Sequence, residues 1–207
     1  MILDYVSEIA SFLLKCNALQ FGSFKLSSGK ESSYYIDLRV VQSFPKHFRL
    51  TIHQLRQTII KEIGCDFDSL GSVPTSGLVF AAALAYEMLK PLIYVRKESK
   101  AHGSSKMIEG YINPGAKVLL IDDVATTGVS VSNAVHTIRA NGGIVENVVT
   151  ILDRLEGAED KLKKINVKLT PITTINDIID TLYEKGLISN NNLKSVMHQI
   201  NRDLDEY

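Results

Sequence analysis

The segment 118–130, with the sequence Val-Leu-Leu-Ile-Asp-Asp-Val-Ala-Thr-Thr-Gly-Val-Ser, constrains the fold of this chain of 207 residues more than any other. Its first four residues are an apolar run too short for a helix, which predicts a strand buried on both faces, as in a parallel sheet. Asp122 and Asp123 then lie at the carboxyl end of that strand, where open α/β sheets bind ligands. Residues 125–129 are predicted to turn into a helix that stops at Asn141-Gly142-Gly143.

The turn that follows the two aspartates has the features of an anion site. Backbone N–H groups and the positive end of a helix dipole suit a phosphate, and Thr126, Thr127 and Ser130 add hydroxyl donors. Carboxylates repel a phosphate, so we expect Asp122 and Asp123 to accept hydrogen bonds from sugar hydroxyls or to hold a cation through water. The alternative is an acidic strand end followed by an ordinary helix. The Gly-x-x-x-x-Gly-Lys pattern of a P-loop is absent here, which argues against an NTPase.

Composition excludes several classes of function. Lys and Arg number 23, as do Asp and Glu, and no basic block stands out, so we expect no nucleic-acid partner. No apolar stretch approaches the roughly 20 residues that a membrane span needs, so we expect no membrane association. Cys16 and Cys65 are widely separated and lack metal-ligand neighbours, which fits a reduced, cytoplasmic compartment.

The order of predicted elements indicates a doubly wound, mostly parallel α/β sheet. We expect three parts within one domain: an N-terminal helix and hood (1–40), an α/β core (41–172) and a C-terminal helical appendage (173–207). Predicted helices cover residues 2–16, 45–64, 78–89, 159–166 and 174–185. The helix at 174–185 has a capping start, Thr174-Ile-Asn-Asp177, and Ser189 caps a last helix. Predicted strands cover 67–73, 91–95, 144–152 and 167–172, after a hairpin or bent loop and strand at 21–39.

Two further segments are candidates for ligand binding. Pro74-Thr75-Ser76-Gly77 makes a second turn between strand and helix, although such turns are common in α/β proteins. Residues 96–115 are mostly polar and too long for an ordinary connection. Five cationic groups lie within eleven residues there, which suits a lid that closes over a polyanion, whereas the alternative is a solvated loop. They are Arg96, Lys97, Lys100, His102 and Lys106.

These motifs together resemble the orotate phosphoribosyltransferases, which belong to the type I phosphoribosyltransferases. Residues 118–130 resemble the signature that binds phosphoribosyl pyrophosphate (PRPP), and residues 96–110 resemble the catalytic loop. Residues 24–37 are similar to the segment on the orotate side, and Asp153-Arg154 is similar to the substrate-binding Asp-Arg pair. The four motifs occur in the family's order and cover roughly residues 20 to 158.

The resemblance implies transfer of a phosphoribosyl group from PRPP to orotate, giving orotidine 5′-monophosphate and pyrophosphate in UMP synthesis, with Mg²⁺ held mainly by PRPP and water. It assigns Asp122 and Asp123 to the ribose hydroxyls and residues 125–129 to the 5′-phosphate. Its implied orotate contacts are Thr126, Arg154, Tyr35 and Ile36. Its implied PRPP contacts are Thr75, Ser76, Gly77, Arg96, Lys97, Lys100, His102, Asp122, Asp123, Val124, Ala125, Thr126, Thr127, Gly128, Val129 and Ser130, of which Arg96, Lys100, His102, Asp122 and Asp123 are implied to be catalytic.

Two departures favour an archaeal-type subgroup. The lysine often found in the turn at 74–77 is absent, so its backbone is the expected ligand, and Ser27 stands where bacterial members carry a lysine that Lys25 or Lys30 would have to replace. The resemblance also implies a homodimer in which the 96–110 loop reaches the partner's site, and it leaves open an association with orotidine 5′-monophosphate decarboxylase. The alternative functions are a phosphoribosyltransferase for another nucleobase and a PRPP-sensing regulator on the same fold.

Overall fold

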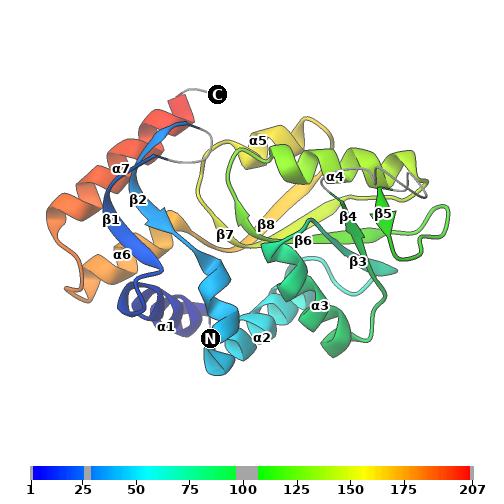
Figure 1. Cartoon of the computed structure of the whole chain (residues 1–207), viewed down its shortest axis with the longest axis horizontal. Coiled ribbons are helices and arrows are strands. Elements are labelled where there is room, and N and C mark those ends of the chain that lie inside the picture. The colour runs from blue at the N-terminus through cyan, green and yellow to red at the C-terminus, as the bar shows by residue number, and fades with distance from the viewer. Residues whose placement is uncertain (1, 26–28, 97–106, 206–207) are drawn as a thin grey trace.

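The computed structural model describes residues 2–25, 29–96 and 107–205, and it is built on one twisted six-stranded sheet (Figure 1). The strand order is β5-β4-β3-β6-β7-β8, and β5 runs antiparallel to its neighbour β4 whereas the other pairs are parallel. The strands are β3 (Ser69–Ser72), β4 (Leu92–Val95), β5 (Ile108–Glu109), β6 (Val118–Ala125), β7 (Asn147–Asp153) and β8 (Lys168–Thr174).

The sheet is wound in two directions from its middle. From β3 the chain passes through α3 (Ser76–Met88) to β4 on one side, whereas from β6 it passes through α4 (Val129–Ala140), β7 and α5 (Ala158–Lys163) to β8 on the other. The connections therefore diverge between β3 and β6, which makes a topological switch point at the carboxyl ends of these strands. This confirms the predicted doubly wound, mostly parallel fold.

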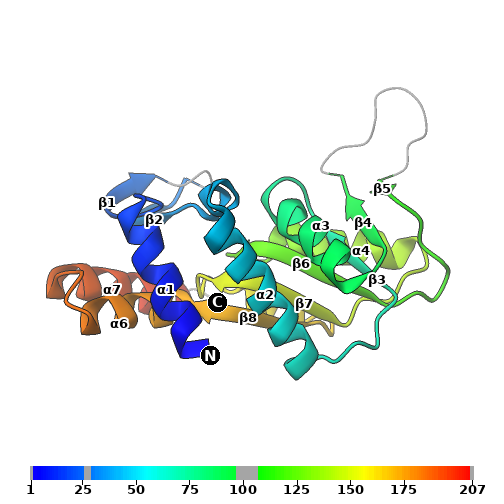
Figure 2. The same ribbon diagram turned by 90° about the horizontal axis from the view of Figure 1, so that it is seen from below.

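Helices cover both faces of the sheet, as Figures 1 and 2 show: α2 (Pro45–Glu62) and α3 lie on one face, and α4 and α5 lie on the other. In β6, Leu119 and Ile121 join the core under α2 and α3, whereas Val118 and Leu120 join the core under α4 and α5. Successive side chains of a strand point to opposite faces, so the uninterrupted apolar run of β6 follows from burial on both sides.

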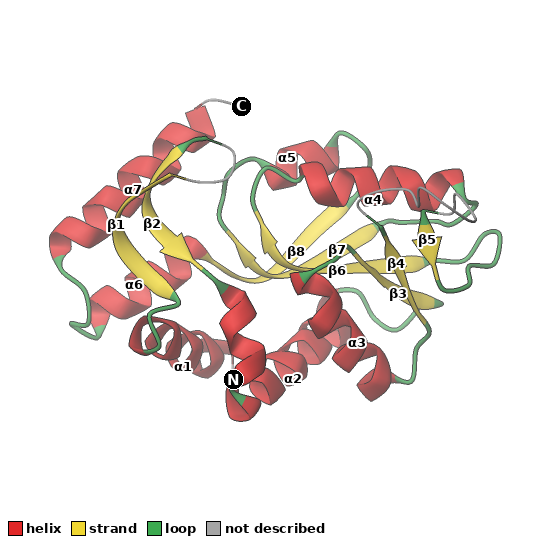
Figure 3. Cartoon of the chain, in the orientation of Figure 1, coloured by secondary structure: helices red, strands yellow, loops and turns green. Residues whose placement is uncertain are grey.

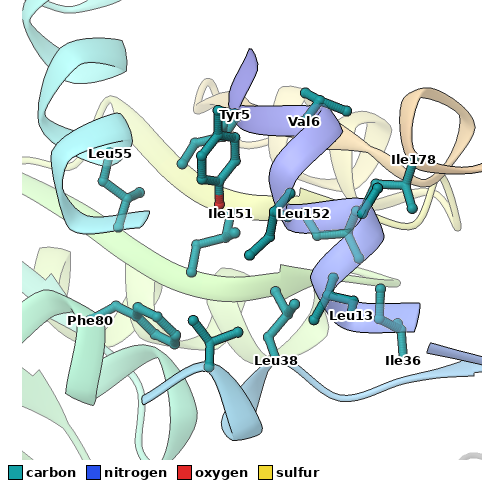
Figure 4. Packing of buried hydrophobic residues seen from close by; sticks show 14 of the residues in the cluster. Tyr5, Val6, Leu13, Ile36, Leu38, Leu55, Phe80, Ile151, Leu152 and Ile178 are labelled. Carbon is teal, nitrogen blue, oxygen red and sulfur yellow. The ribbon is translucent and has the colours of Figure 1, made fainter. Parts of the chain in front are cut away.

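The N-terminal and C-terminal segments pack together beside the sheet (Figure 3). They comprise α1 (Ile2–Lys15), the antiparallel hairpin of β1 (Leu19–Lys25) and β2 (Glu31–Ile36), a 3-10 helix (Leu38–Ser43) that leads into α2, and the last two helices, α6 (Ile175–Glu184) and α7 (Asn190–Asp205). Figure 4 shows side chains of α1, including Leu13, against Leu152 of β7 and Ile178 of α6. The hood, which we define as β1 and β2, therefore shares one apolar core with the sheet and with the C-terminal helices.

Several element bounds differ from the predictions by a few residues, and three differences in the sheet are informative. The strand predicted to end at Ile121 continues to Ala125, because its backbone goes on pairing with β7 after β3 has ended opposite Ile121. The strand β5 lies inside the predicted loop at 96–115, and two residues are too few for a periodic signal. The strand predicted from Ile144 begins at Asn147, and Ile144 forms an isolated bridge with Lys117.

Two further observations concern the described residues as a whole. None of their helices combines the length and the apolar character that a membrane span would need. Cys16 and Cys65 are free thiols.

The start of α6 provides a test of local stability. As predicted, Thr174 caps this helix: its hydroxyl accepts from the Asp177 N–H at 3.2 Å, and its own N–H donates to the Asp177 carboxylate at 2.7 Å. Thr174→Ala should lower the free energy of unfolding, measured in urea, by about 1 kcal/mol. The same change at Thr137, inside α4, should stay within about 0.5 kcal/mol. Equal losses in the two variants would contradict the assigned cap.

Candidate active site

The first turn of α3 approaches the end of β6 very closely at the switch point. A Cβ atom placed on Gly77 would lie 2.3 Å from Oδ1 of Asp122 and 2.8 Å from its Cα, both inside van der Waals contact. Beneath them, the Ser72 hydroxyl donates to the carbonyl oxygen of Ile121 at 2.8 Å and joins β3 to β6. The preceding Pro74–Thr75 peptide bond is cis. Only glycine at position 77 permits this contact, so the two predicted ligand turns meet at one place.

Both helices that begin at the switch point lack a side-chain cap. Thr75 at the start of α3 and Gly128 at the start of α4 make no capping hydrogen bond, in contrast to Thr174 at α6. Gly128 has a φ of 71°, and a Cβ there would lie 3.0 Å from the Cα of Ala158. The first N–H groups of a helix have no partner within it, so these two ends are suited to bind anions.

A hollow of about 300 Å³ lies at the start of α4. It gathers all of the PRPP contacts that the resemblance implied between Val124 and Ser130. Its lining consists of Asp122, Val124, Ala125, Thr126, Thr127, Gly128, Val129, Ser130, Val131 and Asn133.

The carboxylate pair lies between the two helix ends. The backbone N–H of Asp123 donates to Oδ1 of Asp122 at 3.0 Å, and both residues are half-buried. Burial raises the pKa of Asp123, while hydrogen bonds that involve Asp122, backbone N–H groups and the Ser76 hydroxyl act in the opposite direction. A ligand that donates hydrogen bonds or brings a cation would offset the desolvation of this carboxylate.

The end of β7 brings Arg154 beside this hollow. Ala125 pairs with Asp153, and the Arg154 N–H donates to the Ala125 carbonyl at 3.0 Å. Only 6% of Arg154 is exposed, because its side chain extends from the core to the hood. Its Nε donates to the Tyr34 hydroxyl at 3.1 Å and lies 2.8 Å from a carboxylate oxygen of Glu156, and its guanidinium carbon lies 4.6 Å from the centre of the Tyr34 ring.

The turn after β7 is held by Asp153. Its carboxylate accepts from the Leu155 N–H at 2.9 Å, and Leu155 has a left-handed backbone with a φ of 60°. Burial raises the pKa of Asp153, and the nearby Glu159 adds to the rise while the Leu155 N–H opposes it. This short turn aims Arg154 toward the hood.

The two hood residues that the resemblance assigned to orotate, Tyr35 and Ile36, lie on opposite faces of β2. Tyr35 lies on the face of β2 opposite to Tyr34, with its ring 5.8 Å from that of Phe24, and its hydroxyl accepts from Arg39 at 3.1 Å. Ile36 is buried in the core. The hood residues that contact Arg154 are Tyr34 and Ser32, which the sequence motifs do not single out as ligands. Period-two alternation along β2 is the signal that places them on one face.

Arg96 holds the ends of the predicted lid together. Its N–H donates to the carbonyl of Met107 at 2.8 Å, and its guanidinium lies 3.1 Å from Glu109, where β4 meets β5. Lys25 and Lys30 are exposed near the end of the hairpin. The other expected cationic ligands and the departure at Ser27 lie outside the described residues; these are Lys97, Lys100, His102, Lys106 and Ser27.

Comparison with known proteins decides which family has this arrangement. Residues 46–184 match the phosphoribosyl transferase domain family. The orotate phosphoribosyltransferase of Cenarchaeum symbiosum (strain A) is 43% identical over 195 residues, which cover 94% of this chain and 98% of that protein. The chain belongs to the orotate phosphoribosyltransferase family.

The fold of this chain is also similar to two solved structures. The crystal structure of the orotate phosphoribosyltransferase from Aeropyrum pernix has a TM-score of 0.77 at 35% identity and covers 87% of this chain and 99% of that one. The structure of Leishmania donovani UMP synthase has a TM-score of 0.84 at 28% identity, covering 95% of this chain but 42% of the longer one. The type I phosphoribosyltransferase-like fold expected from the sequence is therefore confirmed.

The raised pKa of Asp123 predicts a pH-dependent effect on stability. The folded chain holds this proton more tightly than the unfolded chain, so the wild type loses stability as pH rises from about 4 through the raised pKa. Asn cannot ionise, so the free energy of unfolding of Asp123→Asn minus that of the wild type should be larger at pH 7 than at pH 4. Urea titrations at the two pH values measure it, with Asp180→Asn on the exposed face of α6 as control. A difference that grows toward pH 4 would contradict the assigned cause.

Proposed function

We propose that the protein transfers the 5-phosphoribosyl group from PRPP to orotate at the switch point between β3 and β6. The reaction forms orotidine 5′-monophosphate and releases pyrophosphate, a step of UMP synthesis. The observation that carries the proposal is the pair of uncapped helix ends at the switch point, with two carboxylates between them. PRPP has the complementary pattern, because its two phosphate-bearing ends are separated by a ribose with two hydroxyls. Family membership supports orotate as the acceptor.

Each part of PRPP has a proposed partner. The 5′-phosphate binds at the start of α4, to residues 125–129 and to the hydroxyls of Thr126, Thr127 and Ser130. Asp122 and Asp123 accept from the ribose hydroxyls, which offsets the desolvation of Asp123. The turn of Thr75, Ser76 and Gly77 binds pyrophosphate through its backbone, since its side chains offer no cation.

The proposed chemistry depends mainly on preorganised charge. Breaking the C1′–O bond develops positive charge on the ribose and negative charge on the leaving pyrophosphate. The negative charge on pyrophosphate is neutralised by Arg96 at the base of the loop and by the loop cations Lys97, Lys100 and His102. Orotate is an anion through its carboxylate, and its ring nitrogen N1 loses a proton as it bonds to C1′. The departing pyrophosphate can take up that proton, so the protein needs no strong base. Its residues instead orient the ring nitrogen toward C1′ and exclude water that would hydrolyse PRPP.

Mg²⁺ is the proposed cofactor. As the family resemblance implies, the ion would be held mainly by PRPP and water. Among the described residues there is no group of three or more His, Cys, Asp or Glu side chains that could hold a metal ion. Asp122 and Asp123 fit this arrangement as acceptors for its water ligands, because a nearby cation also offsets the burial of Asp123. The ion would supply further neutralisation of the pyrophosphate.

The proposed orotate site lies between the hood and the core. Arg154 supplies planar N–H donors that match the oxygens of orotate, which a lysine would match less well. Thr126 contributes from the hollow, and β2, which carries Tyr35 and Ile36, forms the hood side. The position of Arg154 against both parts supports this assignment.

We further propose a homodimer in which the 96–110 loop of one chain acts at the site of the other. Three large side chains support an apolar contact, because Tyr86 and Leu89 near the end of α3 are 84% and 89% exposed, and Tyr111 after β5 is 78% exposed. The cytoplasm is the proposed compartment, in keeping with the free thiols. An association with orotidine 5′-monophosphate decarboxylase, which consumes the proposed product, is supported by the likeness to UMP synthase.

Pyrophosphate release tests the proposed reaction. With PRPP and Mg²⁺, orotate should support release, whereas uracil, adenine and xanthine should support little, and a chelator of Mg²⁺ should abolish release with orotate. Preference for another of these bases would replace orotate in the proposal. No release with any base, together with a DNA gel shift at physiological salt, would favour the PRPP-sensing regulator.

Subunit mixing tests the shared site. Lys100→Ala and Asp123→Asn should each be nearly inactive alone, yet their mixture should recover roughly a quarter of wild-type activity after exchange, since half the dimers then have one intact site of two. Mixing each variant with itself is the control. If activity stays at the level of the parents although exchange is shown by mass-tagged chains, the loop acts within its own chain.

A further inference from the structure

We infer that Gln199, on the C-terminal helix α7, is a positioning residue for the orotate side of the site, acting on Arg154 through Ser32. This inference rests on the proposed function of Arg154. It concerns a residue of the predicted C-terminal appendage (173–207), for which the sequence motifs imply no ligand contact.

Gln199 lies at the edge of the hood, and both polar atoms of its side-chain amide make hydrogen bonds. It is 5% exposed, and its Oε1 accepts from both the backbone N–H and the hydroxyl of Ser33, at 2.7 and 2.8 Å. Its Nε2 donates to the Ser32 hydroxyl at 3.2 Å. A flipped amide would place N–H groups against the Ser33 N–H, so these contacts fix the orientation of the amide.

Ser32 passes this constraint to Arg154. Its single hydroxyl proton goes to the carbonyl of Tyr34 at 2.6 Å, which leaves the oxygen lone pairs to accept from Gln199 and from Nη2 of Arg154, the latter at 3.4 Å. Tyr34 is fully buried, and its hydroxyl accepts a hydrogen bond from Nε of Arg154 at 3.1 Å. One buried network therefore joins α7, β2 and the end of β7.

Such a network is needed because the hood is a sheet of two strands. A two-stranded hairpin is marginally stable by itself, so its position depends on what packs against it. In a buried, low-dielectric setting, satisfied polar networks specify one arrangement more sharply than apolar contacts do. Gln199 thus holds β2 in place through its hydrogen bonds to Ser32 and Ser33. Ser32 and Tyr34 of β2 in turn orient the guanidinium group of Arg154.

The network should affect one substrate more than the other. Among the residues that the structure describes, its hydrogen bonds reach Arg154 but include neither the turn at Thr75 to Gly77 nor the start of α4. Loss of the Gln199 amide should therefore weaken orotate binding and leave PRPP binding nearly unchanged, whereas a purely structural role would impair both substrates together.

The test uses Gln199→Met, which keeps the length of the side chain and removes both polar atoms. The KM for orotate should rise about three- to tenfold, in line with one lost hydrogen-bonding group, while the KM for PRPP changes less than twofold. His198→Ala is the matched control, since His198 is the neighbouring exposed residue on α7 and should leave both constants unchanged. Parallel rises in both KM values would overturn the inference.

A double-mutant cycle covers the case in which Gln199→Met also loses stability. Ser32→Ala removes the middle of the network, so its effect on kcat/KM for orotate should be strongly non-additive with that of Gln199→Met. Additive effects would mean that the two residues act separately, and they would overturn the inference. If the wild type releases no pyrophosphate with orotate, the proposed function fails; if it does so and Gln199→Met leaves the orotate KM unchanged, only this inference fails.

Discussion

The contact of Gly77 with Asp122 sets the geometry on which the rest of the site depends. Because no side chain separates the first turn of α3 from β6, the N-terminus of that helix lies against the strand whose end leads into α4. The strand order makes this possible, since β3 and β6 are neighbours whose crossovers diverge. A side chain at position 77 would push the start of α3 away from β6 while most of the apolar core stayed in place.

The same region lacks the side-chain helix caps that the fold provides elsewhere. The helix α6 has a complete capping box, whereas α3 and α4 have no side-chain cap, and Asp123 is a carboxylate whose burial disfavours its charge. These features cost stability in the free protein and suit a ligand with anionic ends and hydroxyl donors. Arg154, the proposed orotate ligand, is different, because it already has protein partners in Tyr34 and Glu156 that set its orientation without a ligand.

Local patterns in the sequence predict much of the fold and the gathering of residues 124–130 around one hollow. The apolar run before Asp122, the Thr174 cap and the Ser189 cap each involve neighbouring residues, and all three are found. The two-residue strand β5 has no period to detect, and β6 extends past its apolar run because of backbone pairing with β7. The network of Ser32, Arg154 and Gln199 joins residues 122 and 167 positions apart, which no short-range pattern encodes.

A crystal structure with PRPP and Mg²⁺ is the most direct test of the central claim, which is that the switch point binds PRPP between two uncapped helix ends. The account predicts the 5′-phosphate on the backbone N–H groups at the start of α4, the ribose hydroxyls on Asp122 and Asp123, and the pyrophosphate on the turn from Thr75 to Gly77. PRPP bound with its phosphates exchanged between these two ends, or bound away from β3 and β6, would contradict it.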